Sequence, residues 1–340
     1  MRSKLPILAG LALAAALALA PGLWIELGRV LTASLGGRQP AAGPAVRRAD
    51  GRGAGASRSA DGQQLIAQAA RAVFAYESLS AQIRLRVRLF QQNLVGKGKY
   101  FQLGPRDDKL LRLNLRIRTA QSEACLQQVC DGRNLWVYQD LPAIDRPLQR
   151  QATVTRVDLR RVHDVVQQQG GAPANSLTAD WLIRGGLANL LKELDAHFDF
   201  YQTDAAQLSG VPVWVVRGRW KPARLMRVAQ QKDATIAQQQ PIPWANLPAH
   251  LPQEAVVWLG QNDLFPFRIQ YRRWDSGAGP TDPGASSDAT ANSIVTMELF
   301  EVATDDIIDP RLFQFQPPTE LEVKDRTDEY LARLGVRPPA

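Results

Sequence analysis

Two stretches of strict alternation constrain the fold of this chain more than any other feature of its sequence. In Ile83–Leu89 aliphatic residues alternate with arginines, and in Leu111–Arg118 they alternate with arginines and one asparagine. Successive side chains of a β-strand point to opposite faces of a sheet, so each stretch predicts a strand with one aliphatic and one basic face. Such strands are typical of an antiparallel sheet that is buried on one side and solvated on the other.

Further segments rich in β-branched and aromatic residues predict more strands. They are Cys125–Val129, Leu135–Tyr138, Phe198–Tyr201, Val211–Val216, Ala255–Leu259, Phe267–Tyr271 and Ile294–Val302. Asp131 and Gly132, between the first two, predict a tight hairpin. Between the alternating stretches we expect a short strand at Tyr100 and Phe101, because the glycines of 96–98 and the Gly-Pro of 104–108 are typical of turns.

Three helices are expected beside these strands. Apolar residues recur at helical spacing over 61–76, with Asp61 as the N-terminal cap, and over 180–194, where Gly185 and Gly186 interrupt a leucine stripe. A shorter helix is expected over 160–168. Amphipathic helices cover one face of a sheet, so the sequence predicts a mainly β domain of the α+β class.

The first 25 residues predict export from the cytoplasm. Arg2 and Lys4 precede an apolar run from Leu5 to Ile25, which is the pattern of a secretory signal peptide. The run is also just long enough to span a bilayer, so both cleavage, for example after Ala18, and retention as an N-terminal membrane anchor stay open. In either case the positive-inside rule places the rest of the chain outside the cytoplasm, in the periplasm or cell envelope.

Composition divides the chain behind this segment into three parts. Residues 26–60 are rich in Gly, Ala, Arg, Pro and Ser and predict a flexible tether. Residues 61–325 hold the expected strands and are predicted to form one domain, and residues 326–340 a C-terminal helix and tail. The protein is expected to be soluble if the first segment is cleaved and anchored in the inner membrane if it is not.

Charge and the absence of catalytic motifs favour a binding role over chemistry. The formal charge of +8 and the isoelectric point near 9.8 favour anionic surfaces, and export makes lipid or solvent a better match than nucleic acid. Cys125 and Cys130 lie on one expected strand with side chains on opposite faces, too far apart for a disulfide. His163, His197 and His250 lie in unrelated contexts, and no nucleophile, phosphate-loop or metal motif is present. We expect no enzymatic activity, metal or cofactor.

Two local signatures resemble those of the LolA family of lipoprotein carriers. The segment Asp131–Tyr138 reads Asp-Gly-Arg-Asn-Leu-Trp-Val-Tyr, like the family's hairpin. The segment Ile307–Pro318, which is followed by Leu321-Glu322-Val323, ends in Phe-Gln-Phe-Gln-Pro-Pro, like the family's closing segment. The resemblance covers residues 61–325. It implies an incomplete antiparallel β-barrel with helices covering the concave face and an apolar cavity that takes acyl chains. The chain is longer than a typical carrier, with additional residues at 141–179, 221–254 and 275–292.

On this interpretation the aliphatic side of the alternating strands lines the ligand cavity. The cavity candidates are Leu85, Val87, Leu113, Leu115, Ile117, Trp136, Trp214 and Trp258, and for the three tryptophans core packing is the favoured alternative. The arginines on the other side, Arg84, Arg86, Arg116 and Arg118, are expected to face solvent or lipid headgroups. The expected affinity comes from hydrocarbon removed from water, about 0.8 kcal/mol for each buried CH₂.

The partners expected on this basis are the acyl chains of lipoproteins or other lipids, together with an anionic membrane surface. The alternative is a membrane-tethered sensor or protein-interaction module of the envelope, in which the half-barrel is filled by its own side chains and binds a protein. Nucleic acid is not an expected partner.

Overall fold

The described residues of the computed structural model form one sheet of twelve strands. These residues are 56–89, 92–105, 109–118, 123–142, 150–169, 186–232, 244, 247, 251–274, 293–334 and 336. The strands are β1 (Ser78–Leu89), β2 (Gln92–Leu103), β3 (Leu110–Arg118), β4 (Glu123–Cys130), β5 (Asn134–Pro142), β6 (Arg150–Asp158), β7 (Phe198–Leu208), β8 (Val211–Trp220), β9 (Glu254–Gly260), β10 (Pro266–Arg272), β11 (Ser293–Thr304) and β12 (Val323–Asp325). Their order is β12-β6-β5-β4-β3-β2-β1-β11-β10-β9-β8-β7.

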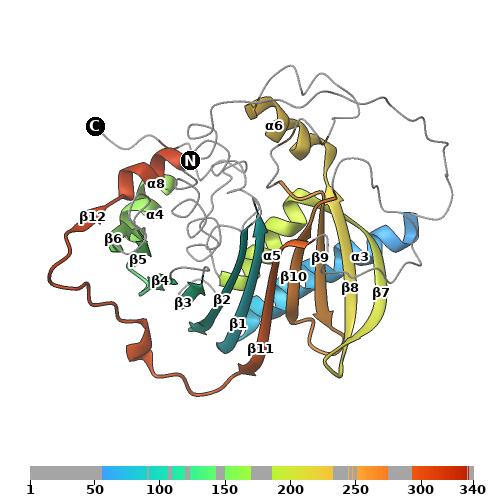
Figure 1. Ribbon diagram of the computed structural model, residues 1–340, viewed down its shortest axis with the longest axis horizontal. Coiled ribbons are helices and arrows are strands. Elements are labelled where there is room, and N and C mark those ends of the chain that lie inside the picture. The colour runs from blue at the N-terminus through green and yellow to red at the C-terminus, as the bar shows by residue number, and fades with distance from the viewer. Residues whose placement is uncertain are drawn as a thin grey trace, which may run out of the picture.

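The sheet is antiparallel and does not close. Every neighbouring pair runs antiparallel except β12 and β6, which are parallel. The end strands β7 and β12 each have one strand neighbour. Figure 1 shows β8–β11 along their length, whereas β3–β5 are strongly foreshortened, so the sheet turns as it crosses the molecule. The predicted fold class, an incomplete antiparallel barrel, is confirmed.

Two helices cover one face of the sheet, which we call the inner face; the opposite side is the outer face. These helices, α3 (Ala56–Ala75) and α5 (Gly186–His197), pack against each other and lie across β7–β10 (Figure 1). Their buried apolar residues form one continuous core with the inner side of the strands. Of the remaining helices, α4 (Leu159–Gln168) packs against α8 (Thr327–Arg333) beside β6, and α6 (Pro222–Lys232) follows β8.

Burial along β1 and β3 follows the alternation in the sequence. Leu113 and Leu115 on β3 are fully buried, whereas Arg116 and Arg118 on the same strand are exposed. Burying a leucine, isoleucine or valine side chain contributes about 1.5–3 kcal/mol. The two-faced strands predicted from the alternation are therefore present as predicted.

The segment between these strands differs from the prediction. Instead of a short strand flanked by turns, β2 runs without interruption for 12 residues. Gly96 and Gly98 lie inside it, and a Cβ atom at Gly98 would collide with the carbonyl oxygen of Asn114 on β3. Glycine here marks a close approach of two backbones and not a turn.

Several element boundaries also differ from the prediction. The first helix begins at Ala56, so Asp61 lies inside it and does not cap it. Helix α5 begins at Gly186, and residues 180–185 of the predicted helix lie outside the described residues. Gly186 has a left-handed backbone with φ of +64°, and a Cβ atom there would collide with the Tyr100 hydroxyl. The helix predicted over 160–168 is present as α4, whereas β6, α6 and β12 were not predicted.

The predicted signal peptide or anchor, and most of the predicted tether, lie outside the described residues. Among the residues that the structure describes, no helix is both long enough and apolar enough to cross a bilayer.

The segment after β11, residues 305–322, crosses the outer face; we call it the C-terminal strap. It contains the short helix η2 (Pro310–Phe313) and leads to β12 and α8 at the opposite end of the sheet (Figure 1). Arg112 on β3 donates a hydrogen bond to the carbonyl oxygen of Leu312 in the strap. Phe313 is buried, and the ring of Phe315 lies 5.5 Å from that of Trp136 on β5. The strap is thus packed onto the outer face.

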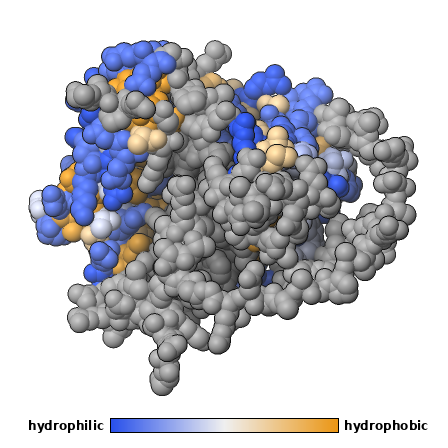
Figure 2. Space-filling view, turned by 90° about the horizontal axis from the view of Figure 1, so that it is seen from above, coloured by the Kyte–Doolittle hydropathy of each residue, from blue (hydrophilic) through white to orange (hydrophobic). Residues whose placement is uncertain are grey.

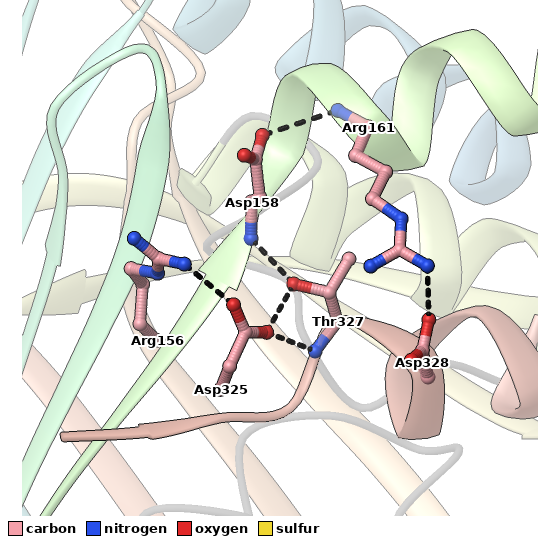
Figure 3. Close-up of polar contacts among 6 residues, drawn as sticks. All are labelled: Arg156, Asp158, Arg161, Asp325, Thr327 and Asp328. Atoms are coloured by element: carbon pink, nitrogen blue, oxygen red, sulfur yellow. Dashed lines mark hydrogen bonds and ion pairs between the residues drawn. The ribbon is translucent and has the colours of Figure 1, made fainter.

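A polar latch fastens the end of the chain to β6 and α4. Its members, shown in Figure 3, are Arg156, Asp158, Arg161, Asp325, Thr327 and Asp328. Arg156 pairs with Asp325, Arg161 pairs with Asp328 at 2.7 Å, and the Thr327 hydroxyl accepts a hydrogen bond from the backbone N–H of Asp158. Seen from above, the surface over α4 and α8 is mainly hydrophilic with hydrophobic residues between (Figure 2).

Gly98→Ala is expected to lower the free energy of unfolding by about 1–3 kcal/mol, the usual cost of overpacking, because the added methyl group collides with the β3 backbone. Urea unfolding of the two proteins measures the difference. Asn93→Ala, at an exposed position of the same strand, is the matched control and is expected within about 0.5 kcal/mol of wild type. Equal unfolding midpoints for wild type and Gly98→Ala would contradict the packing described for β2.

Asp325→Asn is expected to loosen the latch and to cost about 0.5–1 kcal/mol at neutral pH, because Arg156 and Asp325 are partly exposed and solvent screens their charges. Burial of the Asp325 carboxyl raises its pKa, but hydrogen bonds from Arg156 and Thr327 outweigh burial and lower the pKa to about 2 from an ordinary 3.8. A depressed pKa stabilises the fold above pH 3.8 and ceases to do so as the pH falls through 2. The stability difference between wild type and variant, followed by hydrogen exchange of α8, should therefore disappear between pH 4 and pH 2. A difference that persists at pH 2 would count against this role.

Candidate functional site

The structure brings the five predicted aliphatic cavity residues together on the inner face. They are Leu85 and Val87 on β1 and Leu113, Leu115 and Ile117 on β3, and each is at most 2% exposed. They belong to the same core as buried residues of α3 and α5. Their side chains thus lie inside one continuous apolar core. Binding of an acyl chain in place of these contacts stays a prediction.

The three tryptophans proposed as cavity walls do not share one face. In the strand register Trp214 on β8 faces Leu259 on β9, and both contact the main core. Trp258 on β9 lies opposite Arg268 on β10, in a separate small cluster on the outer face. Trp136 on β5 also points outward. Trp136 and Trp258 therefore do not line the concave side.

Trp136 joins the two sequence signatures that resemble the LolA family. Its indole N–H donates to the Asp131 carboxylate at 3.0 Å, and the other oxygen of that carboxylate accepts from the backbone N–H groups of Arg133 and Asn134. On the other side the Trp136 ring contacts Phe315 in the C-terminal strap. The hairpin signature and the closing signature thus contact each other on the outer face, through Trp136 and Phe315.

The outer face of β1–β3 is strongly basic. Eight cationic side chains point to this face: Arg84, Arg86 and Arg88 on β1, Lys97 and Lys99 on β2, and Arg112, Arg116 and Arg118 on β3. The four arginines predicted to face outward do so. The two lysines extend the same surface across β2, the strand that was expected to contain turns.

A groove of about 660 Å³ lies within this basic surface. Its lining includes Lys97, Lys99, Arg112, Arg116 and Arg118, the neutral polar side chains Gln82, Asn114 and Gln127, and also Val95, Gly98, Leu115, Glu123 and Cys125. This volume lies within the range of small-molecule sites in proteins. Five cations around one hollow make an anion the natural ligand.

The charges in the groove are only partly neutralised. Within the lining Arg118 pairs with Glu123 at 3.2 Å, and on the neighbouring strand Arg84 pairs with Glu298 at 3.3 Å. Among the described residues, no carboxylate lies within 4.0 Å of Lys97, Lys99 or Arg116. The sequence pattern missed both lysines because the neighbouring glycines suggested a turn.

Cross-strand register places like charges directly opposite one another. Lys97 on β2 lies between Arg84 on β1 and Arg116 on β3. Like charges opposite each other on neighbouring strands are destabilising, by about 0.2–1 kcal/mol for each pair. A bound anion that meets this row removes the repulsion, so the free protein maintains a charge arrangement suited to a ligand.

The groove lining includes one thiol, that of Cys125. Burial raises the pKa of the Cys125 thiol, an effect that Arg116 partly offsets, so the thiol is neutral at pH 7. Cys130 lies on the inner face, and both cysteines are free, as predicted from their spacing. Within the described ranges no three His, Cys, Asp or Glu side chains are grouped to hold a metal ion.

Neither of the two histidines that the structure describes lines the groove. His163 is exposed on α4, and His250 lies outside the described residues. His197 ends α5, where its Nδ1 donates to the carbonyl oxygen of Glu193 at 2.7 Å. Burial lowers the pKa of His197, so its imidazole is neutral at pH 7.

Comparisons with known proteins assign this chain to no family. No protein-family model and no curated protein matches the sequence. Similar solved structures include a DUF1329 family protein from Desulfovibrio piger, with 11% identity and a TM-score of 0.33, covering 76% of this chain and 98% of that one. LprF from Mycobacterium bovis has 10% identity and a TM-score of 0.35, covering 75% and 99%. The Pseudomonas aeruginosa MucA/MucB complex matches at 9% identity and 0.35, covering 75% and 61%. Likeness at this level supports neither a family nor a function.

Lys97→Gln is expected to stabilise the free protein by about 0.2–1 kcal/mol at low ionic strength, because it removes repulsion from Arg84 and Arg116. The gain should shrink in 0.5 M NaCl, where charges on the surface are screened. Urea unfolding at low and high salt measures both values. Lys324→Gln, at an exposed position on β12, is the matched control. If Lys97→Gln destabilises the protein at low salt, the repulsive row described here is wrong.

Proposed function

We propose that the protein is a non-enzymatic binding module of the cell envelope whose half-barrel is filled by its own side chains and whose ligands bind at its surface. The observation that carries this proposal is the burial of Leu85, Val87, Leu113, Leu115 and Ile117 to at most 2% exposure within one continuous apolar core. A packed core provides a rigid scaffold, and rigid scaffolds position binding residues on their surfaces. The basic groove supplies a surface site of suitable size.

The N-terminal pattern supports a location outside the cytoplasm. Arg2 and Lys4 before a long apolar run direct the remainder of the chain to the periplasm or cell envelope. Cleavage makes the protein a soluble envelope component, whereas retention ties it to the inner membrane. N-terminal sequencing of the mature protein distinguishes the two forms.

A second candidate function is uptake of acyl chains from lipoproteins or other lipids, as the resemblance to the LolA family implies. Two observations favour it. The half-barrel has an inner face of aliphatic side chains on β1 and β3, and the two signature segments contact each other through Trp136 and Phe315. In this alternative an acyl chain replaces part of the contact between the strands and the covering helices.

Native mass spectrometry of protein purified from membranes separates the two candidates. Lipid bound in stoichiometric amount inside the half-barrel supports the acyl-chain carrier and contradicts the filled scaffold. Protein that is free of enclosed lipid, alone or with a polypeptide partner, supports the filled scaffold.

Leu113→Ala is expected to lower the free energy of unfolding by about 2–5 kcal/mol, as for a leucine in a closely packed core. In the filled scaffold the wild type takes up no stoichiometric fluorescent fatty acid, and the variant differs from it only in stability. Titration with the fatty acid and urea unfolding measure the two properties. Saturable uptake by wild type that is lost in a folded Leu113→Asp variant would reject the filled scaffold in favour of the carrier.

A further inference from the structure

The exposed apolar side chains of the molecule gather around its basic surface. Among the residues that the structure describes, five large hydrophobic side chains are exposed: Val95, Val211, Phe300, Ile307 and Leu312. Val95 on β2 lines the groove and is 46% exposed, and Phe300 on β11 is 36% exposed beside Arg84, whose guanidinium lies 5.1 Å from its ring centroid. Four of the five therefore lie on the outer face or in the strap that crosses it.

The C-terminal strap holds the other two of these side chains. Ile307 is fully exposed just after β11, and Leu312 is 36% exposed in η2. The hydrogen bond from Arg112 to the Leu312 carbonyl oxygen joins this part of the strap to the groove lining. Val95 thus lines the cationic groove, and Leu312 lies in the segment that Arg112 joins to it.

Cationic side chains interspersed with exposed apolar side chains are typical of proteins that bind a membrane interface. The cations meet lipid phosphate groups, and the apolar side chains enter the boundary of the acyl region. A water-soluble polyanion gives no role to Val95 or Phe300. The groove also has room for a headgroup, with the neutral side chains of Gln82, Asn114 and Gln127 as hydrogen-bonding partners.

We propose that the outer face of β1–β3 docks on an anionic phospholipid surface, with lipid phosphate groups entering the groove at Lys97, Lys99 and Arg116 and with Val95, Phe300, Ile307 and Leu312 at the interface. The inference extends the proposed function by naming the ligand class of its surface site. It does not depend on whether the inner face is filled. Lipid phosphates compensate the cross-strand repulsion of the Arg84–Lys97–Arg116 row.

The test is sedimentation of the full chain with vesicles of phosphatidylcholine alone or with about one third phosphatidylglycerol. Wild type is expected to bind the anionic vesicles much more tightly than the neutral ones. The double variant Lys97→Gln with Lys99→Gln should bind the anionic vesicles about 20-fold more weakly, because each cation near such a surface contributes about fivefold. Since the N-terminal segment is common to all variants, its own binding cancels in the comparison.

A control variant with the same change in net charge is Arg160→Gln with Lys324→Gln, at exposed positions on α4 and β12. It is expected to keep anionic-vesicle binding within about threefold of wild type. Urea unfolding of each variant establishes that the groove variant is folded, which is expected because removing Lys97 relieves repulsion. Equal binding by the groove variant and wild type would overturn the proposal.

Val95→Asn separates a lipid surface from soluble anions. It leaves the charge unchanged and is expected to weaken vesicle binding severalfold, with no effect on binding of pyrophosphate or of a polyglutamate peptide. If pyrophosphate or polyglutamate binds wild type as tightly as the vesicles and Val95→Asn changes none of the three, the groove takes a soluble anion or an acidic protein segment and the proposal is wrong. Native mass spectrometry reports on the filled scaffold independently, so the two proposals succeed or fail separately.

Discussion

The separation of aliphatic and cationic side chains onto the two faces of β1–β3 is the constraint on which the rest of the structure depends. Each buried aliphatic side chain on the inner face contributes about 1.5–3 kcal/mol, whereas each pair of facing cations on the outer face costs about 0.2–1 kcal/mol. Burial outweighs repulsion, so the register is fixed by the inner face. The outer face follows as a consequence, with its charges aligned across strands in rows such as Arg84–Lys97–Arg116.

Sequence periodicity predicted the parts of the fold in which a single strand carries the whole signal. The alternation in Ile83–Leu89 and Leu111–Arg118 gave two strands and their faces, and an Asp-Gly pair gave the hairpin before Trp136. Periodicity failed where a residue type is required by contact with a neighbouring strand. Gly98 is required by the backbone of Asn114, which sequence spacing does not reveal. Treating Gly98 as part of a turn also hid Lys97 and Lys99.

In the candidate site too, features encoded by a single strand were predicted and features that depend on neighbouring strands were not. The inner residues were found because each strand encodes its own buried face, and the outward arginines were found with them. The groove was not, because it exists only where β1–β4 lie side by side and because its cations come from two neighbouring strands, β2 and β3. The faces of Trp136, Trp214 and Trp258 likewise depend on pairing register. The contact between Trp136 and Phe315 links residues 179 positions apart and explains why the hairpin and closing signatures occur together.

The order of the strands has a consequence for the way the chain assembles. β2–β6 follow β1 as neighbours in sequence, and β7–β11 form a second consecutive series, so each half of the sheet can form from local hairpins. The halves meet only where β1 pairs with β11, which begins more than 200 residues later. Until Ser293–Thr304 has been synthesised, β1 keeps an open edge with unpaired backbone groups, as does β6 until β12 arrives. Chains truncated before β11 should therefore be the ones that aggregate, through an edge that the complete protein never exposes.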